Sequence, residues 1–326
     1  MSGNIWEWMN DWYADDLTGV TYKGPTSSIE NKMVTRSGGY PNNVTDINYR
    51  SKSGRTYRYS DMGFRVIRTI NVEYIGTKKP GETKEVGDIV FTDGSATPYT
   101  TGLTLAGAQK DAAIAVIFYS GTGMNNGSDT TTKRTLGVGL KHNRSGIQWC
   151  ANTANAYSIS IDTIKTNPSS YTFPTDPDSL RNGKNTLQLI GEFLSAPENN
   201  TSDDTIGEGA KNRYPAFYYA INYKEKAQNI VGTIFENEWY LPAYAELYEI
   251  YKLRGSSIKP INIDTISELC GGDKFVVNSS DKYLCSNQNM DYTTSMYTLN
   301  FANGYPSYNN YQKNSTIYYA CAIHEF

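Results

Sequence analysis

The stretch YTLNFANGYPSYNNYQKNSTIYYACAIHEF, Tyr297–Phe326, combines two strand-like ends with a polar middle. Its two ends, YTLNF and YYACAIHEF, have the aromatic and apolar character of strands, and alternation puts Leu299 and Phe301 on one face with Asn300 on the other. The run between them is mostly Asn, Tyr, Ser and Thr. Because an apolar ending such as CAIHEF is costly to expose to water, this stretch is predicted to belong to the folded core.

Upstream segments extend this pattern to a mixed fold. Apolar runs bounded by turns predict three strands, and apolar residues at helical spacing predict helices, two of them with a proline, Pro215 or Pro242, in the first turn. A shorter helix is expected to start at Thr104. The strands are 87–94, 112–119 and 134–142, and the longer helices are 185–194, 215–223 and 242–255. Helices in the middle and strands at both ends predict an α+β domain in which the first and last strands are neighbours, with mixed or antiparallel strands, helices packed on them and long irregular loops.

A charged, Pro- and Gly-containing segment divides the chain. GTKKPGETKEVGD, residues 76–88, lacks periodicity, which is typical of a linker or an exposed crossover. A domain boundary is therefore predicted near residue 80. It separates residues 1–80 from the larger domain, residues 81–326.

Composition excludes two classes of partner. The net charge is −3 and both signs are mixed along the chain, so no basic stripe for nucleic acid is expected. No apolar run has membrane-spanning length, and the first residues, MSGNIWEWMNDWY, lack the pattern of a signal peptide. The 27 tyrosines outnumber the 10 phenylalanines, and tyrosine suits both half-exposed strands and binding surfaces.

The reactive side chains form no catalytic or zinc motif. The four cysteines, at positions 150, 270, 285 and 321, contain no CxxC pair, which argues against zinc and leaves a disulfide open. The only histidines are His142 and His324, and neither lies in a recognised motif. No catalytic residue is predicted, and the chain is expected not to be an enzyme.

GNIWEWMNDWY, residues 3–13, and GFRVIR, residues 63–68, resemble the C-terminal portion of the formylglycine-generating, sulfatase-modifying family. That family has a subtype of the C-type lectin fold. The resemblance implies a Ca²⁺ site built from the backbone carbonyls of Gly3 and Ile5 and the carboxylate of Glu7, hard oxygen ligands of the kind Ca²⁺ prefers. No other cofactor is expected. The family's oxidases carry reactive cysteines after this motif, but residues 36–66 contain none, which argues against that activity.

A second resemblance covers about residues 86–326. EWYLPAYAELYEIYK, residues 238–252, with YLCSNQNMDYTTSMYTLNFANG and YYACAIHEF, is similar to bacterial C-type-lectin-like domains that include the variable proteins of diversity-generating retroelements. In that family a reverse transcriptase copies a template repeat with errors at adenines, which turns Asn-type codons into Asn, Tyr, Ser, Thr, Asp, His, Cys, Leu or Ile. In residues 283–326, 23 of 44 are Asn, Tyr, Ser or Thr. Five residues cannot arise in this way and are excluded from the diversified set: Gln288, Met290, Met296, Gln312 and Lys313.

The resemblance implies a ligand-binding protein, displayed on a bacterial surface and lipoprotein-anchored, whose variable region spans about residues 283–326. Its partner would be an unknown protein or glycan. Four neighbouring tyrosines of this region, Tyr305, Tyr308, Tyr311 and Tyr318, are predicted to face solvent together. The full predicted contact set is Tyr292, Thr294, Tyr297, Tyr305, Ser307, Tyr308, Tyr311, Tyr318, Cys321 and His324. Two alternatives stay open: a Ca²⁺-dependent sugar lectin, although EPN and WND motifs are missing from the C-terminal half, and a formylglycine-generating enzyme.

Overall fold

The computed structural model describes residues 6–12, 32–36, 50–54, 56, 62–63, 73–125, 129–166, 181–199, 206, 211–254, 261–276, 278, 280–304, 306–307 and 311–326. Contacts divide the chain into two compact units, Met1–Val72 and Glu73–Phe326. Each unit is described by itself.

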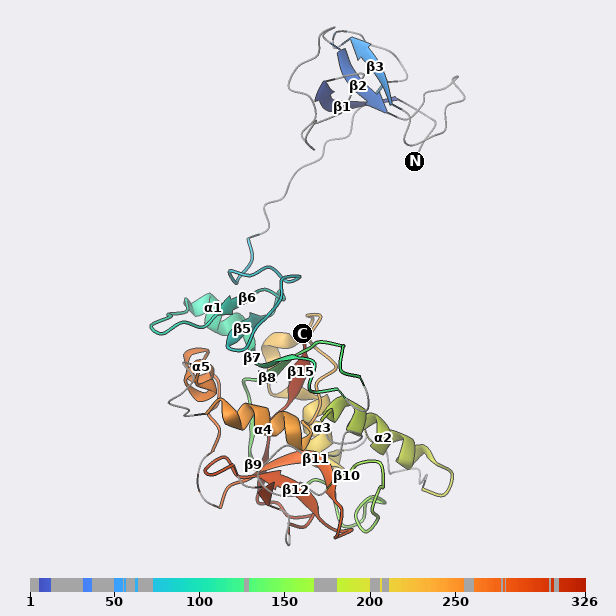
Figure 1. The fold of residues 1–326 in the computed structure, drawn as a ribbon, viewed down its shortest axis with the longest axis vertical. Helices are drawn as coiled ribbons and strands as arrows, with labels where there is room; N and C mark the ends of the chain where they lie inside the picture. The colour runs from blue at the N-terminus through green and yellow to red at the C-terminus, as the bar shows by residue number, and fades with distance from the viewer. Residues whose placement is uncertain are drawn as a thin grey trace. The chain divides into compact units, whose positions relative to one another are not determined.

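The first unit contains a small sheet in the order β3-β2-β1-β4 (Figure 1). Strand β1 is Trp6–Trp12, β2 is Lys32–Arg36, β3 is Arg50–Gly54 and β4 is Met62–Gly63. The WEW motif lies on β1, which pairs antiparallel with β2 and parallel with β4. Of the predicted strand over residues 63–68, the described part is Gly63 at the end of β4.

The second unit begins before the boundary predicted near residue 80. The Ile75 amide donates to Asp93 Oδ2 (3.0 Å), and Lys78 pairs with Ala96 in a β-bridge. The Lys78 ammonium also lies 2.6 Å from an Asp88 carboxylate oxygen. The charged segment 76–88 is therefore an integral part of the second unit, because its backbone and Lys78 bind residues of that unit.

Five strands of the second unit form an antiparallel sheet in the order β15-β8-β7-β5-β6. The predicted strands appear as β5 (Asp88–Phe91), β7 (Ala113–Gly121) and β8 (Arg134–Gly139). The other two are β6, Ala96–Pro98, and β15, Ile323–Glu325. The last strand pairs with β8, so the prediction that the first and last strands are neighbours is wrong.

The second sheet of this unit has six strands among the described residues, in the order β13-β12-β11-β14-β9, with β10 pairing β11. Its strands are β9 (Asn143–Ile147), β10 (Lys165–Thr166), β11 (Tyr283–Asn289), β12 (Met296–Leu299), β13 (Pro306–Ser307) and β14 (Tyr318–Ala320). The single C-terminal strand expected from the sequence is therefore two strands. The chain leaves one sheet after Ala320 and enters the other at Ile323, because β14 pairs with β9 and β11 whereas β15 pairs with β8.

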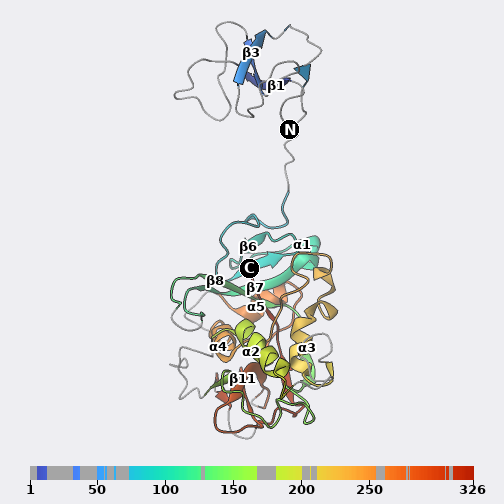
Figure 2. The same cartoon turned by 90° about the vertical axis from the view of Figure 1, so that its right-hand side faces the viewer.

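Helices connect and cover these sheets (Figures 1 and 2). They are α1 (Gly107–Ala112), α2 (Gly183–Ser195), α3 (Pro215–Ile221), α4 (Tyr244–Lys252) and α5 (Ile263–Leu269), with 3₁₀ turns η2 (Tyr223–Glu225) and η3 (Gln228–Ile230). Pro215 opens α3 as predicted. Pro242 precedes α4, whose cap is Ala243, and α1 is capped at Ala106 instead of Thr104. Helix α5 has no counterpart in the sequence prediction.

Helix α4 lies between the two sheets and contacts β7 on one side and β11 and β12 on the other (Figure 1). Its Glu246 is fully buried and accepts hydrogen bonds from the amides of Ala243 (2.8 Å) and Gly183 (2.9 Å). Arg134 Nη1 and the Tyr240 hydroxyl both lie 3.3 Å from its Oε1. This one carboxylate thus joins α4, the start of α2 and strand β8. No helix in the described part of the chain is long and apolar enough to cross a membrane.

Candidate functional site

Three predicted contact residues lie at or near the surface of the six-stranded sheet, beside strands β11, β12 and β14. Tyr292 is 51% exposed, in the turn between β11 and β12. Thr294 and Tyr311 are half-buried, and the Tyr311 ring packs edge-on against Tyr318 with centroids 6.0 Å apart. Of these three, Tyr292 offers the largest accessible aromatic surface.

Four predicted contact residues are buried, and their assignment to an exposed face is wrong. Tyr297 is 1% exposed, because its side of β12 faces helix α4, where its ring contacts Tyr244 edge-on. Tyr318 is also 1% exposed, because β14 lies between β11 and β9 in the interior of the sheet. The predicted exposure of Tyr318 beside Tyr311 is therefore not observed.

Cys321 and His324 are buried for a related reason. Cys321 is fully buried at the point where the chain crosses from one sheet to the other. His324 is 7% exposed and its ring packs against Trp239 (5.1 Å between centroids) and Phe326 (4.8 Å). Burial lowers the pKa of His324, so it is a neutral packed side chain near pH 7.

The remaining predicted positions fall largely outside the described residues. Tyr305 and Tyr308 are not described, and Ser307 is described only as backbone of β13. The predicted Ca²⁺ ligands likewise fall outside the described side chains. Gly3 and Ile5 are not described, and Glu7 is described only as backbone of β1. Elsewhere in the described part of the chain, no group of three or more His, Cys, Asp or Glu side chains could hold a metal ion.

Lys313, which the sequence marked only as excluded from the diversified set, has a structural role that the sequence did not predict. It is 0% exposed, and its ammonium donates to four backbone carbonyls: Ala156 (2.6 Å), Tyr157 (3.1 Å), Ile159 (3.2 Å) and Thr293 (2.5 Å). A lysine within a run of Gln and Asn looks like a surface residue. Its burial becomes apparent only in the folded structure, where the carbonyls of residues 156–159 and of Thr293 surround its ammonium.

The surroundings of the Lys313 ammonium are polar but uncharged. Among the described residues it has no carboxylate partner, and the face of the Trp149 ring lies 5.3 Å from it to the centroid. Burial lowers the pKa of Lys313 to about 8, against a smaller raising effect of Cys150. Four carbonyl dipoles and a π face compensate the charge that burial removes from water.

Lys313 joins three segments, residues 156–159, 289–295 and 311–317, which we call the display loops. The Lys313 amide donates to Thr294 O (2.9 Å), and Ser295 forms a β-bridge with Gln312. The turn that carries Tyr292 is closed by Asn289, whose Oδ1 accepts from the amides of Asp291 (2.7 Å) and Tyr292 (3.2 Å). Segments 289–295 and 311–317 are therefore held together by backbone hydrogen bonds, and segment 156–159 is joined to them through the Lys313 ammonium.

The display loops carry most of the exposed large apolar side chains of the described residues. Among the described residues, seven large apolar side chains are exposed, and four of them belong to these loops: Ile159 (38%), Met290 (44%), Tyr292 (51%) and Ile317 (61%). Because the carbonyls of Ile159 and Thr293 both bind the Lys313 ammonium, two of the three loops meet at one point. Loop side chains held by a fixed scaffold are a common form of binding surface.

Strands β11 and β12 place a polar layer behind these loops. Ser286 Oγ, Gln288 Nε2 and Thr298 Oγ1 are buried without a hydrogen-bond partner in the described structure. Leu284 pairs with Thr298 and Gln288 pairs with Met296, and the register shifts between these two pairs. The Gln288 carbonyl is used, because its Oε1 accepts from the Ile161 amide (2.8 Å).

The described cysteines are not prepared for thiolate chemistry. All four are buried, and none of them is in a disulfide in the described structure. Burial raises the pKa of Cys270 and Cys285 to about 12, and it raises that of Cys321 as well. A thiol with such a pKa stays protonated near pH 7 and is a poor nucleophile.

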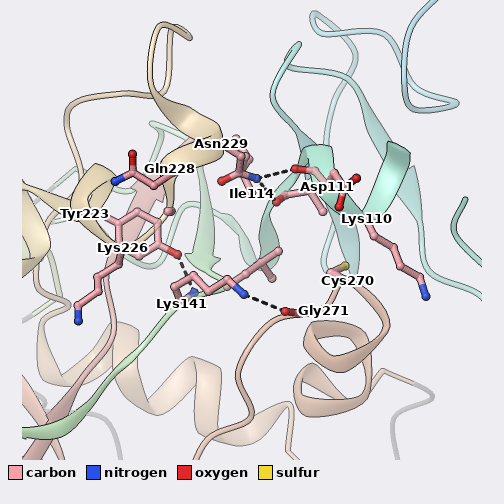
Figure 3. Close-up of a pocket in the computed structure, with 13 residues that line it drawn as sticks. Lys110, Asp111, Ile114, Lys141, Tyr223, Lys226, Gln228, Asn229, Cys270 and Gly271 are labelled. Atoms are coloured by element: carbon pink, nitrogen blue, oxygen red, sulfur yellow. Dashed lines mark hydrogen bonds between the residues drawn. The ribbon is translucent and has the colours of Figure 1, made fainter. Parts of the chain in front are cut away.

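A separate pocket of about 430 Å³ lies between α1, η3 and the end of α5 (Figure 3). Its inner polar groups bind one another: Lys141 Nζ donates to Gly271 O (2.9 Å), and Asn229 Nδ2 donates to the carbonyls of Asp111 (3.0 Å) and Ala113 (2.9 Å). In Figure 3, the side chains of Lys110 and Lys226 extend away from Lys141 to opposite sides. The lysines therefore do not converge on one point, as binding of a single small anion would require.

Comparison with known proteins gives one match, which covers the first unit. Residues 1–70 match the family model described as "Sulfatase-modifying factor enzyme 1-like domain". This confirms the resemblance seen in the WEW segment and supports the formylglycine-generating-enzyme-like superfamily for that part of the chain. No curated protein and no solved structure matches.

Proposed function

We propose that the chain is a non-enzymatic ligand-binding protein whose contact surface is formed by the display loops, and that the part of this surface within residues 283–326 is diversified by retroelement mutagenesis at positions outside the excluded set. The observation that carries the proposal is that Ile159, Met290, Tyr292 and Ile317 are all exposed and lie on loops that are tied to one another by hydrogen bonds of Lys313. In its natural setting the protein would be displayed on a bacterial surface and would bind a protein or glycan.

The scaffold beneath the loops favours this role. Tyrosine contributes a rigid ring with few rotatable bonds, so Tyr292 can bury much area at low entropic cost on binding. The neighbouring backbone is held by Asn289 and Lys313, so the loop conformation depends little on the identity of the exposed side chains. Such a loop tolerates substitution at its exposed positions.

Burial accounts for part of the division between residues that can vary and residues that cannot. Three of the five residues excluded from the diversified set are buried, Gln288 (1% exposed), Met296 (0%) and Lys313 (0%), whereas Met290 is 44% exposed. Tyr292 and Thr294, which adenine mutagenesis of Asn-type codons can produce, lie on the display loops and remain in the proposed contact set with Tyr311. Tyr297, Tyr318, Cys321 and His324 belong to the core and are removed from it.

A binding screen tests the proposal. The full chain is applied to an immobilised glycan array and to a protein array, together with Tyr292→Ala and with Ile234→Ala, a matched loss of an 83% exposed apolar side chain outside the display loops. We expect a ligand that binds wild type and Ile234→Ala equally and binds Tyr292→Ala about tenfold or more weakly, because central aromatic residues dominate binding energy. Ligands whose affinity is unchanged by Tyr292→Ala, Met290→Ala and Ile159→Ala would contradict the proposal.

The family match of residues 1–70 favours a second candidate, an enzyme of the formylglycine-generating class. A thiol-dependent version of that chemistry needs thiolates, whereas residues 1–72 contain no cysteine and the cysteines of the second unit are buried. The test is incubation of the full chain with a cysteine-containing sulfatase peptide under oxygen, followed by mass spectrometry. Loss of the cysteine thiol with gain of an aldehyde would establish this candidate, and an unchanged peptide is the expected result.

A further inference from the structure

The Lys313 ammonium occupies a cage of carbonyl oxygens. Four backbone oxygens, from Ala156, Tyr157, Ile159 and Thr293, lie between 2.5 and 3.2 Å from its Nζ. An ammonium has three N–H donors, so four acceptors cannot each receive a bond of their own. The four oxygens therefore surround the positive charge in the way that ligands surround a metal ion, and they do not match the three N–H bonds one to one.

The chemistry of the cage selects the class of cation that fits. Its ligands are neutral carbonyls, with a Trp149 ring face at 5.3 Å, and no carboxylate among the described residues approaches the ammonium. Ca²⁺ prefers six to eight oxygens at 2.3–2.6 Å, usually including carboxylates. Rings of neutral carbonyls are the ligands of K⁺ in selectivity filters. The cage thus suits a single positive charge.

We infer that Lys313 is a positioning residue whose ammonium fills a monovalent-cation site, and that the emptied site binds a small monovalent cation such as a primary alkylammonium ion or K⁺. The position of the cage gives this site its role. It joins the loop that carries Ile159 to the loop that carries Tyr292, two exposed side chains of the proposed contact surface. That consequence rests on the proposed function, whereas the cation site itself does not.

Backbone amides next to the cage report on it. The Tyr157 amide donates to Ala154 O (3.0 Å) and the Ser295 amide donates to Tyr292 O (3.0 Å), and both hydrogen bonds close the loops that Lys313 joins. Opening of these loops exposes the amides to solvent exchange. Hydrogen exchange at these amides therefore measures directly how firmly Lys313 holds the loops together, without a ligand.

The experiment uses the full chain with Lys313→Ala, which removes the three terminal methylenes and the ammonium. We expect amide exchange in residues 156–159 and 289–295 to accelerate roughly tenfold or more while amides of β7 keep their rates. Addition of propylammonium chloride, which replaces the deleted atoms, or of KCl in a sodium-free buffer, should restore slow exchange. Tetramethylammonium chloride at the same ionic strength is larger and has no N–H donor, and it should not.

Two further variants keep the test decisive. Lys84→Ala removes another buried lysine, whose ammonium donates to Pro80 O (2.9 Å), and should leave the display loops unchanged. Lys313→Met keeps most of the side-chain volume and loses the charge, so it decides the question if Lys313→Ala fails to fold. The inference is overturned if Lys313→Met exchanges like wild type, or if neither cation slows exchange in Lys313→Ala. A failed binding screen with successful cation rescue would overturn the proposed function alone.

Discussion

At the scale of single residues, the Thr298 hydroxyl of the second unit is buried at an energetic cost. Thr298 is 0% exposed, and its Oγ1 has no hydrogen-bond partner in the described structure. An unpaired buried hydroxyl costs about 1–3 kcal/mol. Strand β12 therefore carries a penalty that an apolar residue of the same shape would not.

Thr298→Val should raise the free energy of unfolding by about 1 kcal/mol, because it removes the unpaired hydroxyl and keeps the branched shape. The matched control is Thr186→Val, since the buried Thr186 hydroxyl donates to Asn182 O at 3.1 Å and its loss should be destabilising. Thermal melts of both variants followed by near-ultraviolet circular dichroism measure the difference. A lower melting temperature for Thr298→Val would show that a water or another group pairs with the hydroxyl.

At the scale of elements, Glu246 determines how helix α4 is held between the sheets. Burial raises the pKa of Glu246, and Arg134 together with the amides of Ala243 and Gly183 acts in the opposite direction. Arg134 also lies 3.3 Å from Glu325, so strand β15 shares the same group of charges. The end of the chain and the central helix therefore depend on one buried cluster.

Glu246→Ala should lower the free energy of unfolding by about 3–5 kcal/mol, because it leaves the Arg134 charge partly uncompensated and two buried amides without acceptors. The control is Glu238→Ala, whose side chain is 69% exposed and pairs with a 50% exposed Lys184, and its effect should fall within about 1 kcal/mol. Urea unfolding of the two variants provides the comparison. Equal midpoints for them would refute a structural role for the cluster.

At the scale of the whole second unit, acid stability depends on a histidine held neutral. His142 is 7% exposed and packs 4.4 Å from the Phe275 ring, and its Nδ1 lies 3.2 Å from the Tyr283 hydroxyl. Burial lowers the pKa of His142 to about 4, against the raising effect of Asp273. Between pH 6.5 and about 4 the unfolded chain therefore binds a proton at this position that the folded chain does not.

This difference makes folding less favourable as the pH falls below 6.5, by up to about 1.4 kcal/mol per pH unit until the folded histidine is itself protonated. Carboxylates add their own dependence, so the test compares variants. His142→Gln should lower stability at pH 7 but show a smaller further loss between pH 6.5 and 4.5 than wild type. Parallel slopes for the two proteins in thermal melts would mean that His142 is already charged in the folded state.

The sequence predicted those features of the second unit that depend on local pattern. Apolar runs identified β5, β7 and β8, and Pro215 identified the start of α3, because burial period and fixed proline φ are local properties. Burial within a sheet is set by non-local pairing. Tyr292 and Tyr318 look alike in sequence, yet one lies in a turn and the other between two strands.

The same limit explains Lys313 and the division of the C-terminal strand. Neither the carbonyl cage nor the change of sheet between Ala320 and Ile323 leaves a mark in residue type, since both arise where distant segments meet. The first unit shows the opposite case. Its WEW segment was sufficient to identify the family that residues 1–70 match.

Sequencing of the DNA beside the gene tests whether the binding surface is diversified by a retroelement. We predict a template repeat resembling codons 283–326, next to a reverse transcriptase gene, which differs from those codons at template adenines. The differences should fall at the exposed Tyr292 and the half-buried Thr294 and spare buried positions such as Lys313 and Met296. Absence of any such repeat, or differences spread equally over the buried positions, would contradict a diversified binding surface.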